Sequence, residues 1–227
     1  MRIDDSKARL YYLKEAAEQQ WSVRALERNI NTLYYQRLLS TQNTTPEIAL
    51  AKDSQTPDIR YFIKDPYVFE FLNIPEPNSF SEQKVETTLI ENLQKFLMEL
   101  GKGFSFVGRQ YRISTETEHF YVDLVFYNYI LKCFVLFDLK IGKLTHQDIG
   151  QMDMYRRLFD DLKKPEGDLP TIGIILCTEK SETVVKYSIM NDTPQLFATK
   201  YMPYLPTEQE LIDEIENEKL RFNLLKD

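Results

Sequence analysis

Three runs of aromatic and β-branched residues follow one another between positions 104 and 140, and they constrain the fold more than any other feature. They read FSFVGRQYRIS, HFYVDLVFYN and KCFVLFDLK, with short polar turns between them. Such runs are typical of consecutive antiparallel strands. A helix is predicted from about Thr145 to Leu162, and the continuous apolar run PTIGIILCT that follows is typical of a strand buried on both faces.

Helices are predicted on either side of these strands. The segment FSEQKVETTLIENLQKFLMELG predicts one long amphipathic helix that begins near Ser81 and stops at Gly101. Further along, SETVVKYSI predicts a short helix, QLFATKYMP a last strand, and TEQELIDEIENEKLRFNLL a C-terminal helix. The order α-β-β-β-α-β-α-β therefore indicates an α/β fold with a mixed central sheet flanked by helices on both faces.

The N-terminal part of the chain has a different character. Residues 4–39 predict two helices, the second of which begins after Ser22 and contains VRALERNINTLYYQRLLS. The polar segment 41–57 predicts a linker, and residues 65–79, DPYVFEFLNIPEPNS, predict a short helix ended by two prolines. We therefore expect a small N-terminal helical region with its linker over residues 1–57 and the main domain over residues 58–227.

Composition excludes several classes of protein. A net charge of −7 argues against a broadly basic nucleic-acid-binding surface, because Lys and Arg supply most non-specific affinity for DNA; any DNA contact must be local. No apolar run approaches the roughly 18 residues of a membrane span, and MRIDDSKARL lacks the apolar core of a secretory signal. These features predict a cytoplasmic protein without a membrane partner. Cys133 and Cys177 lie in apolar runs, which predicts buried thiols and no disulfide.

Charged residues interrupt two of the predicted strands. Asp123 lies in the otherwise apolar YVDLVF, where an unpaired carboxylate would cost several kcal/mol. Asp138 and Lys140 are two residues apart, so their side chains share one face of a strand. Mg²⁺ needs only one or two carboxylates besides water, and a lysine beside it can offset charge on a phosphate in the transition state. Each of these residues alone also fits an ordinary strand end.

Other polar residues lie near these positions. Glu91 lies on the seam between the apolar and polar faces of its predicted helix, and Gln151 and Tyr155, four apart, share a helix face where they can hydrogen-bond a phosphate or a base. His119 and His146 are expected to be turn or surface residues. The candidates for contacting DNA or phosphate are Gln151, Tyr155, Arg109, Gln110, Arg112 and Lys143. Taken singly, Gln151 and Tyr155 also fit a surface amide and a half-buried ring, and Arg109, Gln110 and Arg112 also fit an exposed strand face.

The order of these residues resembles the PD-(D/E)XK nucleases, the restriction-endonuclease-like superfamily. The likeness is closer still to its YhcG-type family, and it rests on LIENLQKFLMELGKGFSFVGRQYRI, FYVDLVFYN, CFVLFDLKIGKLTHQDIGQMDMY and IGIILCTEK, which lie between Leu89 and Lys180. Residues 9–39 are similar to the end of the helical domain that precedes the nuclease in this family. The resemblance implies that this domain is shortened in this chain.

The resemblance implies a divalent-metal-dependent DNA endonuclease with a restriction-endonuclease-like core, in a restriction, defence or mobile-element setting. It implies that Glu91, Asp123 and Asp138 are catalytic and hold Mg²⁺, with Mn²⁺ as a substitute, and that Lys140 completes the catalytic set. Gln151 and Tyr155 match the family's QxxxY element. This chain has Asp-Leu-Lys where most members have Glu-Leu-Lys, an acid shorter by one methylene. A catalytically weak DNA-binding or protein-interaction module remains the alternative, and a homodimer through the N-terminal or C-terminal helices is a further expectation.

Overall fold

The computed structural model describes residues 3–40, 59, 63–64, 67–72, 81–204 and 206–224. The chain divides into two compact units, one of residues 1–68 with 205–227 and one of residues 69–204. The predicted linker and the predicted boundary between residues 57 and 58 lie outside the described residues, so that boundary stays a prediction. In the described part of the chain, no helix has both the length and the apolar character needed to cross a membrane.

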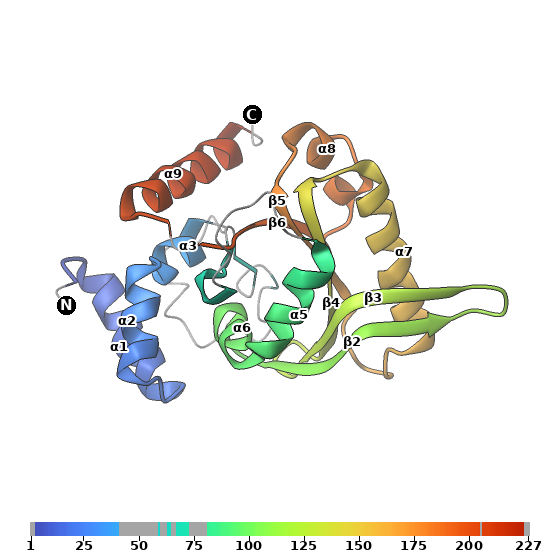
Figure 1. Ribbon diagram of the computed structural model, residues 1–227, viewed down its shortest axis with the longest axis horizontal. Coiled ribbons are helices and arrows are strands. Elements are labelled where there is room, and N and C mark those ends of the chain that lie inside the picture. Colours follow the sequence, from blue (N-terminus) through green and yellow to red (C-terminus); the bar gives the residue numbers. More distant parts are fainter. Residues whose placement is uncertain are drawn as a thin grey trace. The chain divides into compact units, whose positions relative to one another are not determined.

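The first unit is mainly helical. Its elements are α1 (Ser6–Glu18), α2 (Val23–Asn31), α3 (Tyr34–Ser40), the two-residue β1 (Tyr67–Val68) and α9 (Glu208–Leu224), as labelled in Figure 1. Two tyrosines of α1, Tyr11 and Tyr12, pack with Tyr34, Tyr35 and Leu38 of α3 in a buried cluster. Aromatic packing therefore joins α1 to α3.

The second predicted helix of this region is in fact two helices. The interruption lies at Thr32 and Leu33, where Leu33 adopts a left-handed backbone with φ 49°. The Arg37 Nε donates to the freed Thr32 carbonyl oxygen at 2.7 Å. The predicted start of the first piece is confirmed, because the Ser22 hydroxyl accepts the Ala25 N–H at 3.2 Å.

The second unit contains the predicted mixed sheet. Its strands are β2 (Phe104–Ser114), β3 (His119–Asn128), β4 (Cys133–Lys143), β5 (Ile172–Glu179) and β6 (Leu196–Met202). They lie in the order β6-β5-β4-β3-β2, with antiparallel β2–β3 and β3–β4 pairs and parallel β4–β5 and β5–β6 pairs. The predicted α/β class is therefore confirmed. Both cysteines are free and buried, as expected.

Helices cover both faces of this sheet, as Figure 1 shows. They are α5 (Glu82–Glu91), α6 (Leu93–Leu100), α7 (His146–Leu162) and the short α8 (Glu182–Lys186), with single 3₁₀ turns at Glu70–Leu72 and Ile189–Asp192. On one face, the Phe96 ring of α6 lies 5.7 Å from the Phe126 ring and 6.0 Å from the Phe137 ring. On the other face, Met152 of α7 packs in a buried cluster with Leu136 of the sheet.

Two predicted helices differ in the structure. The long helix predicted over residues 80–101 is divided at Asn92, which separates α5 from α6, although its predicted cap at Ser81 and its stop at Gly101 are confirmed. The helix predicted over residues 65–79 is instead β1 and a 3₁₀ turn where it is described. Its backbone is extended here because the Phe69 N–H donates to the Met202 carbonyl oxygen at 2.7 Å. The remainder of that segment lies outside the described residues.

The regular alternation of side chains along β3 is interrupted at Asp123. Val122 and Val125 are three residues apart, yet both lie in the cluster beneath α7, whereas regular alternation would place them on opposite faces. On the neighbouring strand, Gln110 lies between the residues paired with Val122 and Leu124 and has φ 44°. The two strands therefore exchange faces at Gln110 and Asp123.

Candidate active site

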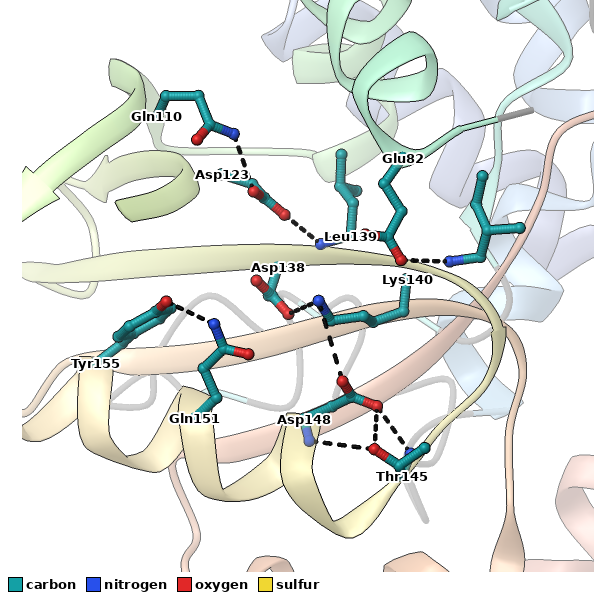
Figure 2. A network of polar contacts seen from close by, with 11 residues as sticks. Glu82, Gln110, Asp123, Asp138, Leu139, Lys140, Thr145, Asp148, Gln151 and Tyr155 are labelled. Carbon is teal, nitrogen blue, oxygen red and sulfur yellow. Dashed lines mark hydrogen bonds and ion pairs between the residues drawn. The ribbon is translucent and has the colours of Figure 1, made fainter. Parts of the chain in front are cut away.

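Asp123 and Asp138 are brought together by the pairing of β3 with β4. The register pairs Leu124 with Phe137, so Asp123 and Asp138 are the next residues along this antiparallel pair. One carboxylate oxygen of Asp123 accepts the Leu139 N–H at 2.8 Å (Figure 2). The Asp138 side chain is buried, with an exposed fraction of 3%. Two acids far apart in the sequence thus occupy neighbouring positions in the sheet.

The environment of Asp138 favours its protonated form. Burial, with the nearby charge of Asp123 as the second cause, raises the pKa of Asp138 to about 7. The Lys140 ammonium acts in the opposite direction through an ion pair of 3.1 Å, yet it does not restore the ordinary pKa of 3.8. The site is therefore short of positive charge.

Lys140 lies between two acids. Its ammonium lies 3.1 Å from Asp138 and 4.0 Å from Asp148, the latter on α7 (Figure 2). Burial acts against the charged form of Lys140, but the charge and hydrogen bond of Asp138 together with the charges of Glu82 and Asp148 outweigh burial and raise the pKa of the lysine. Asp148 is itself held by the N-cap residue Thr145, whose hydroxyl donates to it at 2.6 Å. Sequence reasoning missed Asp148, although the Thr-x-x-Asp spacing of a capping box could have identified it.

The helix acid linked to Asp123 is Glu86, through the Gln110 amide, and the structure does not bring Glu91 to this position. The Gln110 amide nitrogen donates to Glu86 at 2.7 Å and to Asp123 at 3.0 Å. Glu86 is buried, which raises its pKa, whereas Glu91 lies exposed at the last residue of α5. Five residues correspond to about 140° of helical rotation, so the two side chains point in different directions. One turn before Glu86, Glu82 accepts the Ile141 N–H at 3.2 Å.

Gln151 and Tyr155 share one face of α7, as predicted from their spacing. The Gln151 amide donates to the Tyr155 hydroxyl at 2.5 Å (Figure 2). The Tyr155 ring is buried and lies 6.2 Å from the Phe120 ring. Tyr155 therefore orients Gln151, whose side chain is only partly buried.

The predicted basic residues lie on the surface of the unit. Arg109 and Arg112 are exposed on β2, which ends the strand order, and Lys143 is exposed at the last residue of β4. The charge of Arg109 acts on Glu86 and lowers its pKa, against the larger effect of burial. Contact of these three residues with DNA stays a prediction. Gln110 lies among the acids.

The carboxylates of this site meet part of what a divalent ion needs. Among the residues that the structure describes, no group of three or more His, Cys, Asp and Glu side chains is arranged to hold a metal ion. Mg²⁺, however, commonly uses one or two carboxylates and completes its shell with water and substrate oxygens. Asp123 and Asp138 fit this requirement, because burial and, as the second cause, the charge of Asp123 already raise the pKa of Asp138.

Comparisons with known proteins add independent information. The family model described as the YhcG PDDEXK nuclease domain matches residues 60–216. The chain is 35% identical over 216 residues to YhcG, a candidate nuclease of Escherichia coli (strain K12); the match covers 95% of this chain and 57% of that protein. This chain therefore spans little more than half the length of that relative.

Two solved structures are also similar. A repair endonuclease from Pyrococcus abyssi matches with a TM-score of 0.38 and 19% identity, over 56% of this chain and 50% of that one. EndoMS in a complex with double-stranded DNA matches with a TM-score of 0.40 and 14% identity, over 57% of this chain and 48% of that one.

Proposed function

Because the chain belongs to the YhcG-type family of PD-(D/E)XK nucleases, we propose that it is a divalent-metal-dependent endonuclease that hydrolyses phosphodiester bonds in DNA. The observation that carries the proposal is the state of Asp138. This buried carboxyl lies beside Asp123 and one lysine, and its pKa is about 7. A cation between the two acids would restore the balance of charge. Mg²⁺ is the expected ion, and Mn²⁺ is the expected substitute.

Each strand residue then has a distinct role. Asp123 and Asp138 would hold the ion, which when bound would supply a water of lowered pKa and positive charge for the scissile phosphate. The Lys140 ammonium, partly buried beside Asp138, would offset the charge that develops on the phosphate in the transition state. Gln151, oriented by Tyr155, would donate to a phosphate oxygen or to a base.

The role predicted for Glu91 passes to Glu86 in this proposal. Glu86 shares the Gln110 amide with Asp123, which links it to this strand acid. Glu91 is kept as a matched control, because it has the same chemistry on the same helix but is exposed. Glu86→Gln should therefore lower cleavage by about tenfold or more, whereas Glu91→Gln should leave it unchanged.

The experiment is the nicking of supercoiled plasmid DNA by the purified protein in Mg²⁺, Mn²⁺, Ca²⁺ or EDTA. We expect cleavage in Mg²⁺ and Mn²⁺ and none in EDTA. Lys140→Ala should lower the rate by about 100-fold to 1,000-fold, and calorimetric titration of Mn²⁺ should show that this variant keeps near-parental metal affinity. Absence of cleavage by the parental protein in every divalent ion would favour the alternative, a DNA-binding or protein-interaction module with the nuclease fold.

The setting of this activity is also a proposal. We infer a role in restriction, defence or mobile-element maintenance, and an assembly of two copies through the N-terminal or C-terminal helices. Light scattering of the purified protein tests the dimer, because the expected mass is twice the 26.9 kDa of one chain.

A further inference from the structure

Gln110 has an unusual backbone for its place in the fold. It lies within β2, whose other described residues are extended, yet its φ is 44°, in the left-handed region that residues other than glycine rarely adopt. Such a conformation persists only where surrounding contacts hold it, and it commonly marks a functional position. The contacts of Gln110 are therefore informative.

The first contact is made by its side chain. The amide nitrogen of Gln110 uses its two hydrogens on two carboxylates, Glu86 of α5 at 2.7 Å and Asp123 of β3 at 3.0 Å. Two carboxylates that share one amide nitrogen lie close together, so their negative charges repel each other. Burial, and to a smaller extent the charge of Asp123, raises the pKa of Glu86. A neutral donor shared by both acids holds them together without neutralising either. The amide thus defines the distance between the helix acid and the strand acid.

The second effect comes from its backbone. Arg109 and Arg112 are three residues apart, so a regular strand would place them on opposite faces. Ile113 and Tyr111 pack into the cluster beneath α7, which leaves Arg112 on the opposite face. Arg109 is on that face as well. It is paired with Leu124, which is paired in turn with Phe137, whose ring packs on the α6 side of the sheet. The charge of Arg109 also acts on Glu86 of α5. The exchange of faces at Gln110 therefore brings both arginines to the side of the sheet that carries Glu86.

We propose that Gln110 is a positioning residue with two separable parts: its amide holds Glu86 and Asp123 together for a divalent ion, and its left-handed backbone places Arg109 and Arg112 as a phosphate-binding strip beside them. This inference rests on the proposed nuclease function. Different substitutions of Gln110 separate the role of its amide from the role of its backbone. Glycine keeps the left-handed backbone and deletes the amide, whereas valine, which is β-branched, opposes the left-handed backbone as well.

The amide is tested by Gln110→Gly, with calorimetric titration of Mn²⁺ and thermal unfolding of the metal-free protein. We expect about a tenfold loss of Mn²⁺ affinity and an unchanged unfolding temperature. Lys132→Gly is the matched control, because Lys132 also has a left-handed backbone, with φ 52°, in the turn between β3 and β4; it should keep parental affinity. A Gln110→Gly protein that binds Mn²⁺ as the parent does, or that unfolds earlier while keeping its affinity, overturns the amide's role.

The backbone is tested by binding of a short DNA duplex in Ca²⁺ over a range of salt concentrations. Arg109→Ala and Arg112→Ala should each lower the slope of log affinity against log salt by about 0.9, whereas Lys163→Ala, an exposed lysine that follows α7, should not. Gln110→Gly should keep the parental slope, and Gln110→Val should lower the slope about as much as an arginine variant does. Unchanged slopes in both arginine variants overturn the strip, even if Gln110→Val does not fold.

The two proposals fail in different ways. A parental protein that binds Mn²⁺ but neither binds nor cuts DNA removes the nuclease function and the strip together, while the calorimetry still decides the role of the amide. A parental protein that cuts DNA, with a Gln110→Gly variant of parental Mn²⁺ affinity, keeps the nuclease function and removes the amide's role.

Discussion

Two buried aspartates in the same unit, Asp138 on β4 and Asp153 on α7, have opposite electrostatic environments. Asp153 accepts from Arg156 at 3.0 Å and from Arg157 at 2.8 Å. Burial would raise the pKa of Asp153, but the hydrogen bonds and charges of Arg157 and Arg156 together outweigh burial, and the pKa lies below its ordinary value. Asp138 has one lysine, faces Asp123, and has a raised pKa.

The difference separates a structural acid from a candidate catalytic one. A carboxylate that only joins parts of the fold is best stabilised when cations surround it, as at Asp153. A carboxylate that binds a metal ion must not be fully neutralised by neighbouring cations in the metal-free protein. Asp138 is in this state, and its charge destabilises the metal-free fold. Four predictions can break or sharpen this comparison.

The largest expected effect is on catalysis. Asp138→Asn should lower the rate of plasmid nicking in Mg²⁺ by about 1,000-fold or more, because the neutral amide lacks the negative charge that holds the ion. Asp153→Asn should leave the rate per folded molecule within a few-fold of the parent. Single-turnover nicking by both variants, with folding checked by circular dichroism, makes the measurement. Comparable losses in the two variants would contradict the division of roles.

The second effect is on stability, where the Asp153 variant should lose more than the Asp138 variant. Asp153→Ala should lower the free energy of unfolding by about 2–4 kcal/mol, because it leaves the buried Arg156 guanidinium short of a partner. Asp138→Ala should not lower it, since the deletion removes a carboxylate that repels Asp123. Urea denaturation in EDTA measures both values. A larger loss in the Asp138 variant would show that its ion pair with Lys140 is structural.

The third effect is a difference in pH dependence between the two acids. The pKa of folded Asp138 lies above its ordinary value of 3.8, so its contribution to stability is present below about pH 4 and is lost as the pH rises through about 7. Asp138→Asn should therefore be more stable than the parent at pH 8, on the order of 2 kcal/mol, with little difference at pH 4.

Asp153 should show the opposite trend. Its lowered pKa gives a contribution that is present above about pH 4 and lost as the pH falls below that value. The stability difference between Asp153→Asn and the parent should thus stay constant from pH 8 to pH 5. Urea denaturation in EDTA across this range tests both trends, and a pH-independent difference for Asp138→Asn would show that its carboxyl is ionised throughout.

The smallest expected effect concerns Gln151 and Tyr155 of α7, the helix that also carries the structural acid Asp153. Tyr155→Phe keeps the buried ring but removes the hydroxyl that accepts a hydrogen bond from the Gln151 amide at 2.5 Å. Loss of one hydrogen bond should lower the nicking rate by about 2-fold to 10-fold, with the unfolding free energy within about 1 kcal/mol of the parent. Gln151→Ala should lower the rate at least as much. A normal rate in Gln151→Ala would remove this pair from the site.

Much of the second unit was predictable because its signals are local. The strands were recognised from runs of β-branched and aromatic residues, and their order with the intervening helices indicated a mixed sheet. The breaks at Leu33 and Asn92 were not recognised, because the flanking residues keep a helical pattern. The first break depends on a left-handed residue and on an arginine that bonds the freed carbonyl oxygen.

Part of the candidate site was predictable for the same reason. Asp138 and Lys140 share a strand face at a spacing of two, and Asp123 interrupts an apolar run. Glu86 and Glu91 were not distinguishable, since each directly follows an apolar residue of one predicted helix, Val85 or Ile90. Only the rotation of α5 against the sheet places Glu86 inward and Glu91 outward.

The sequence by itself determined which elements form and which strand residues carry charge, because period-two and helical patterns depend on near neighbours in the chain. Tertiary structure alone decided which charges meet. The pairing register set Asp123 beside Asp138, the rotation of α5 selected Glu86, and the left-handed Gln110 joined Glu86 to Asp123. Coulomb and hydrogen-bond energies depend on distances between atoms, and between separate elements those distances exist only after the elements have packed.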